Sequence, residues 1–101
     1  MDILTTKYNN MVKINFRQIP IYQGIAKQER VACDISESLA NAIYSTVPGI
    51  AAHVLAEKIY KNGEVEMNPE EMAIVRKVTE VLPGQYADSI NDHLDEKEGQ
   101  Q

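Results

Sequence analysis

The stretch Asp34–Lys61, DISESLANAIYSTVPGIAAHVLAEKIYK, holds the largest block of core-type residues in the chain. In its first half, Leu39, Ile43 and Val47 recur at every fourth position. In its second half, apolar residues continue at helical spacing, at Ile50, Val54, Leu55 and Ile59. A repeat of about 3.6 residues is typical of amphipathic helices, so the stretch predicts a helical core on which the rest of the chain packs.

A Pro-Gly corner divides this stretch. Asp34 is a suitable N-cap, and Glu37 three residues later completes the pattern of a capping box, which predicts a first helix over residues 35–47. Pro48 fits an early position of a second helix, and Gly63 fits its C-cap. Two helices are the favoured interpretation, and one kinked helix is the alternative.

The chain before this stretch predicts β-structure. Residues 12–17 alternate apolar and polar, as a half-buried strand does, and Ile19 and Ile21 continue the run around Pro20. Proline cannot donate a ladder hydrogen bond, which indicates an edge strand. A second strand is expected over residues 29–33, with Val31 and Cys33 inward. The two would pair as an antiparallel hairpin that lies against the helices.

The chain after this stretch predicts two further helices. Residues 64–67 are either a linker or a third small strand. Asn68, Pro69 and Glu71 have the pattern of a capped helix start, which predicts a helix over 69–82. A last helix is expected over 85–94. The predicted organisation is a flexible arm over 1–11, a single α+β domain over 12–94 and a disordered acidic tail over 95–101. Its fold is an N-terminal β-hairpin packed on a bundle of three to four short helices.

Composition excludes several functional classes. The 101-residue chain has a net charge of −5 and no dense basic cluster, so nucleic acid is not an expected partner. The second helix of the Pro-Gly corner starts with Ile50, Ala51 and Ala52, which are core residues rather than DNA-reading side chains. No apolar run is long enough for a bilayer, and the N-terminus lacks signal-peptide features. With a single cysteine, Cys33, we expect a cytoplasmic protein without membrane contact.

The residues that carry chemistry show no catalytic or metal-binding pattern. His53, His93 and Cys33 are far apart and lack helical ligand spacing, so no metal site is expected. The carboxylates lack the alternating pattern of a calcium loop. The glycines form no phosphate-binding loop. These observations predict a protein that is not an enzyme and needs no cofactor.

An interaction protein remains as the main functional hypothesis. The helix over 50–59 is apolar around much of its circumference, so Ile50, Val54, Leu55 and Ile59 are predicted to form an interface with a second copy or a protein partner. The alternative, from another class, is a small-ligand or nucleotide-binding protein, which would use the basic hairpin residues Arg17, Lys27 and Arg30. Convergent basic groups around a cavity would favour the alternative, and an exposed apolar patch would favour the interface.

Several segments together resemble small, poorly characterised proteins of bacteriophages and prophages. The segments, all between residues 12 and 94, are KINFRQIPIY, DISESLANAIY, GIAAHVLAEKIY, NGEVEMNPEE and YADSINDHL. The resemblance implies a phage or prophage context, in which small non-enzymatic proteins for particle assembly or interference with host defence are common. It assigns no functional residue.

Overall fold

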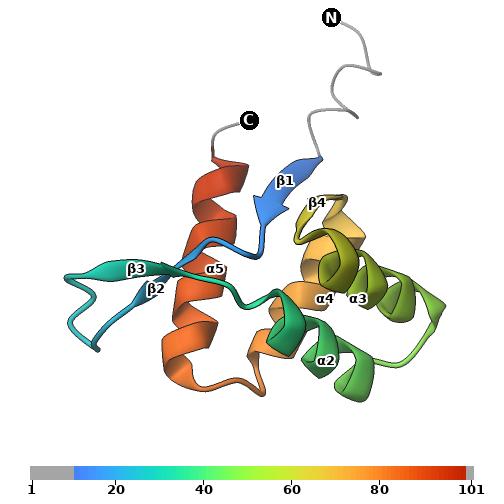
Figure 1. Ribbon diagram of the computed structural model, residues 1–101, viewed down its shortest axis with the longest axis horizontal. Helices are drawn as coiled ribbons and strands as arrows, with labels where there is room; N and C mark the ends of the chain where they lie inside the picture. Colours follow the sequence, from blue (N-terminus) through green and yellow to red (C-terminus); the bar gives the residue numbers. More distant parts are fainter. Residues whose placement is uncertain (1–10, 100–101) are drawn as a thin grey trace, which may run out of the picture.

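The computed structural model describes residues 11–99. Within that range four strands and four helices follow one another, which confirms the predicted α+β class (Figure 1). Their order is β1 (Val12–Asn15), β2 (Ile19–Tyr22), β3 (Arg30–Cys33), α2 (Ser36–Thr46), α3 (Ile50–Asn62), β4 (Glu64–Met67), α4 (Pro69–Thr79) and α5 (Gly84–Glu98). The predicted arm lies outside the described residues, apart from Met11.

The strands form two separate antiparallel pairs, which corrects the predicted single hairpin. β1 pairs with β4, with Val12 opposite Met67, and β2 pairs with β3, with Ile19 opposite Cys33. A turn at residues 15–18, in which the Gln18 amide donates to the Asn15 carbonyl, separates β1 from β2. Residues 64–67 are therefore a strand, which was one of the two interpretations left open.

The β2–β3 hairpin lies against α5, whereas β4 lies beside α3 and α4 (Figure 1). The Tyr22 amide at the end of β2 donates to Oγ of Ser89 on α5, at 2.9 Å. Val31 of β3 is exposed, although an inward position was predicted, and Cys33 is only half-buried. The reason is that β2 packs closely on α5, whereas β3 reaches α5 through the long side chain of Arg30.

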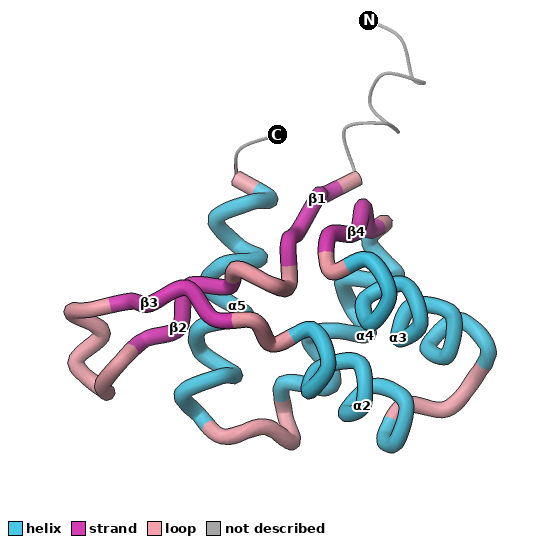
Figure 2. Tube along the Cα trace, viewed as in Figure 1, coloured by secondary structure: helices cyan, strands magenta, loops and turns pink. Residues whose placement is uncertain are grey.

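The Pro-Gly corner separates two helices, as predicted, and Figure 2 shows the loop between α2 and α3. Gly49 has φ +105°, a conformation that side chains with a Cβ rarely adopt, and it precedes α3 directly. Pro48 lies in the loop rather than in the first turn of α3. At the start of α2 the predicted capping box is absent, since the Asp34 carboxylate accepts hydrogen bonds from the Ser36 amide and hydroxyl instead.

The start of α4 has the predicted capping box in both directions. Asn68 Oδ1 accepts from the Glu71 amide at 2.8 Å, and Glu71 Oε1 accepts from the Asn68 amide at 3.0 Å. Met67 and Met72, which hold the two positions of a hydrophobic staple around this cap, are both buried. α4 ends at Thr79 instead of residue 82, because the amides of residues 80–82 bond three positions back and tighten the chain into a turn.

α5 continues to Glu98, four residues beyond its predicted end. Residues 95–98 of the predicted disordered tail are therefore helical. Nη2 of Arg76 on α4 lies 2.7 Å from Asp95 Oδ1 and 2.8 Å from Glu98 Oε1, so a cation on the neighbouring helix attracts these carboxylates. Residues 100–101 lie outside the described part.

The core lies where α2, α3, α4 and α5 meet the inner faces of the strands. Its largest fully buried side chains include Ile14, Phe16, Ile19, Leu39, Ile43, Leu55, Ile59, Met67, Val75, Ile90 and Leu94. Phe16 lies in the turn after β1, and its amide donates to the Gly63 carbonyl, while its carbonyl accepts from the Ile35 amide. This turn therefore connects the end of α3 to the start of α2.

Candidate functional site

The three basic residues predicted to bind a ligand do not meet at one site. Nη2 of Arg17 donates to the Lys61 carbonyl, at 3.3 Å, near the end of α3. Lys27 instead faces α5, where its Nζ lies 3.5 Å from Asp92 Oδ2. Arg30 also faces α5 and forms a two-pronged ion pair with the carboxylate of Glu96. The protein's own carboxylates therefore hold the last two cations.

Lys27 and Arg30 are organised around the ring of Tyr22. Their charged ends lie 5.2 Å and 4.9 Å from its centroid, within the range of cation–π interactions. The Tyr22 hydroxyl donates to Asp92 Oδ2 at 2.7 Å. This hydrogen bond, followed by the charges of Lys27 and Arg30, lowers the pKa of Asp92 below 3.8 against the opposing effect of burial. The cluster joins the hairpin to α5.

The four predicted interface residues divide between the core and the surface. Leu55 and Ile59 are fully buried, while Ile50 and Val54 are 77% and 42% exposed. Helical geometry explains the division, because residues 52, 55, 56 and 59 share the face of α3 that packs on α2 and α4, and residues 50 and 54 point away from it.

Further exposed side chains extend this outer face across α2 and α3. Tyr44 and Tyr60 are exposed, and the rings of Tyr44 and His53 lie 5.7 Å apart between centroids. Tyr44, His53 and Tyr60 line a shallow groove of about 320 Å³ between the helices. We name Tyr44, Ile50, His53, Val54 and Tyr60 the α2–α3 surface. The sequence analysis assigned neither Tyr44 nor Tyr60 to an interface.

Charges of both signs border the α2–α3 surface. Glu57 lies on α3, with its carboxylate 3.6 Å from His53 Nε2 and 3.9 Å from Lys61 Nζ. These are exposed pairs one helical turn apart, and such pairs contribute little to stability. They place one acidic side chain, Glu57, between two basic side chains at the border of the surface.

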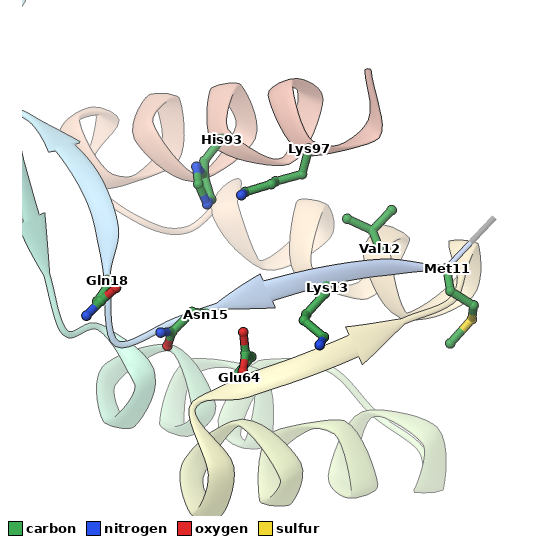
Figure 3. A pocket seen from close by; sticks show the side chains of 8 residues that line it. All are labelled: Met11, Val12, Lys13, Asn15, Gln18, Glu64, His93 and Lys97. Atoms are coloured by element: carbon green, nitrogen blue, oxygen red, sulfur yellow. The ribbon is translucent and has the colours of Figure 1, made fainter. Parts of the chain in front are cut away.

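A second candidate lies between β1, β4 and α5. It is an open cavity of about 490 Å³ (Figure 3), whose lining residues are Met11, Val12, Lys13, Asn15, Gln18, Glu64, His93 and Lys97. His93 and Lys97 project from α5 toward the strands. Sequence reasoning missed this cavity, because Lys13 and Lys97 are far apart in the chain and β1 was expected to pair elsewhere.

Among residues 11–99, no group of three or more His, Cys, Asp and Glu side chains is arranged to hold a metal ion. No helix of the described part is long and apolar enough to cross a membrane. The chain matches no protein-family model, and neither a curated protein nor a solved structure matches it. The candidate sites rest on the geometry of this chain alone.

Proposed function

We propose that this chain is a non-enzymatic interaction protein that associates with a second copy of itself through the α2–α3 surface. The observation that carries the proposal is the exposure of two tyrosines and two aliphatic side chains on two adjacent helices. Exposed apolar patches on small soluble proteins often mark interaction sites, and tyrosine is enriched at the centre of interfaces.

The charges at the border favour a second copy as the partner. In a two-fold dimer the same surface faces itself, so a border of one sign would repel its own image. Glu57 lies between two basic side chains, His53 and Lys61, on the same helix. A two-fold partner can therefore present an acid to a base, while Ile50 and Val54 are removed from water.

The biological setting is proposed from the sequence resemblance alone. It is assembly or an accessory role in a phage or prophage, carried out in the cytoplasm. The alternative function, a ligand site at Arg17, Lys27 and Arg30, is less favoured, since the Arg17 side chain donates to a carbonyl near the end of α3 while the other two cations pair with α5.

Light scattering after size-exclusion chromatography of the full chain tests self-association. The wild type is expected to be dimeric at low salt and at about 0.5 M salt, where charge–charge attraction is screened and an apolar contact persists. Ile50→Ser is expected to be monomeric. The matched control is Ile25→Ser, in the loop between β2 and β3, because Ile25 is also highly exposed but lies off the α2–α3 surface.

Two results would contradict the proposal. One is a monomeric wild type at every concentration and salt tested. The other is dissociation by Ile25→Ser to the same extent as by Ile50→Ser, which would show that general surface hydrophobicity drives association. Circular dichroism of each variant checks that the helices are intact. We expect them to be, because substitutions at exposed positions usually change folding stability little.

A further inference from the structure

The cavity between β1 and α5 contains two lysines that lack a carboxylate partner. Lys13 comes from β1, and Lys97 comes from the last turn of α5. Neither forms an ion pair with any residue in the described range. Most other basic side chains of this acidic protein do form one, namely Lys27, Arg30, Lys58, Lys61 and Arg76. Two unpaired cations therefore line one cavity.

Two further lining residues, Asn15 and Gln18, carry side-chain amides that can donate hydrogen bonds. Oδ1 of Asn15 already accepts from the Arg17 amide, at 3.0 Å, which leaves the side-chain nitrogen of Asn15 as a donor. The side-chain amide of Gln18 has no hydrogen-bond partner within the described part of the chain. Glu64, at the start of β4, is the one acidic lining residue. Glu66 lies opposite Lys13 in the strand register, outside the lining.

His93 lines the cavity on the side of α5, and the charge of Lys97 in the same cavity affects its pKa. Its side chain is 12% exposed, and its Nδ1 is buried with no hydrogen-bond partner among residues 11–99. Burial lowers the pKa of His93 below 6.5, and the charges of Lys97 and Arg30 lower it further, while Glu96 at 3.9 Å raises it. A negative charge near Lys97 would therefore raise the pKa of His93.

We infer that this cavity binds a small anion through Lys13 and Lys97, in the form of a phosphate or carboxylate group. Glu64 would accept a hydrogen bond from a hydroxyl or amine of the same molecule. A volume of about 490 Å³ lies within the range of small-molecule sites. Ammonium groups bind phosphate and carboxylate oxygens by charge-assisted hydrogen bonds. The inference is independent of self-association, since no residue of the α2–α3 surface lines this cavity.

Proton NMR of the two histidine rings in the full chain tests the inference. Inorganic phosphate is the probe in one arm and succinate in the other, each compared with sodium chloride at equal ionic strength. The pKa of His93 is expected to rise saturably with the probe that binds. His53 lies on α3 and lines a different groove, so it reports general salt effects in the same spectrum.

Three variants show whether the lysines hold the anion. Lys13→Gln and Lys97→Gln are each expected to weaken binding about tenfold, the effect of one lost charge-assisted hydrogen bond. Lys77→Gln is the matched control, because Lys77 lies in the last turn of α4 as Lys97 lies in that of α5. Equal responses of both histidines, no saturation with either probe, or equal weakening by Lys77→Gln would overturn the inference.

Discussion

The Tyr22 hydroxyl donates a 2.7 Å hydrogen bond to Oδ2 of Asp92 and so joins the end of β2 to α5. Gln85 of α5 donates to the Tyr22 carbonyl, and Ser89 accepts from the Tyr22 amide. The backbone and the side chain of one residue thus fix the position of the hairpin. Lys27 and Arg30 belong to this joint, because both pair with carboxylates of α5.

Tyr22→Phe is expected to raise the pKa of Asp92 toward its ordinary value. The Tyr22 hydrogen bond is the largest of the effects that lower it. Carboxyl-carbon NMR titration measures the change. Tyr86→Phe is the control, because Tyr86 lies on the same helix as Asp92 but its hydroxyl has no hydrogen bond within the described residues. An unchanged Asp92 titration in Tyr22→Phe would contradict the role given to the hydroxyl.

Acid should destabilise the fold through Asp92 and Asp34. The pKa of Asp34 is also lowered, chiefly by hydrogen bonds from the Ser36 hydroxyl and amide. Because both pKa values are lower in the folded chain than the ordinary 3.8, the unfolded chain binds protons first as pH falls. Their stabilisation is complete above 3.8 and is lost as pH falls through the folded values. Urea unfolding at stepped pH, over roughly pH 2–5, should show a shallower acid loss in Asp34→Asn and Asp92→Asn.

Gly63→Ala should destabilise the protein by about 1–3 kcal/mol, the range for a residue held in an unfavourable backbone conformation. Gly63 has φ +74°, and an added Cβ would lie 2.6 Å from Nε of Arg17. Chemical denaturation measures the loss. Gly24→Ala is the matched control, because Gly24 has no positive φ and no atom within 4 Å of an added Cβ. Equal stability of the two variants would refute the argument.

Asn68→Ala should cost about 1 kcal/mol of stability, since it removes the N-cap of α4 and one half of the capping box. The midpoint of urea unfolding measures the effect. Asn41→Ala serves for comparison, since Asn41 is exposed within α2 and caps no helix. The expected result is a lower midpoint for Asn68→Ala only.

Leu55→Ala and Val54→Ala should separate the two roles within the predicted interface. Leu55 is fully buried, so truncation should cost about 2–5 kcal/mol of folding stability. Val54 is partly exposed on the α2–α3 surface, so its truncation should weaken self-association and change folding stability less. Thermal unfolding and light scattering of both variants provide the comparison. A larger loss of folding stability for Val54→Ala than for Leu55→Ala would contradict the assignment of Leu55 to the core and Val54 to the surface.

Features set by residues close in sequence could be predicted. The capping box depends only on Asn68 and Glu71, which are three residues apart. The C-cap role of Gly63 depends only on its position directly after the last residue of α3. Asp34 shows the limit of such reasoning, since the box pattern with Glu37 was present but the carboxylate bonds to Ser36. A nearer donor, two positions away, competes successfully for the same oxygen.

Features set by distant residues could not be predicted. The alternation in β1 shows which side chains point inward, but it does not select between residues 29–33 and β4 as a partner. The length of α5 depends on Arg76, which lies on another helix. The candidate sites have the same origin. Tyr44 lies beside His53 because α2 packs on α3, and Lys13 and Lys97 line one cavity because β1 lies beside α5.

The pairing of β1 with β4 also has a consequence for the order of folding. Val12 and Met67 are neighbours in the sheet, yet α2 and α3 lie between them in the chain. Closing so long a loop costs entropy that local contacts do not, so β2–β3 and the helix pair should form earlier. Because synthesis runs from the N-terminus, Ile14 is made before Val65, its partner in the sheet. The apolar face of β1 therefore stays uncovered until α2 and α3 have formed and have brought β4 beside it.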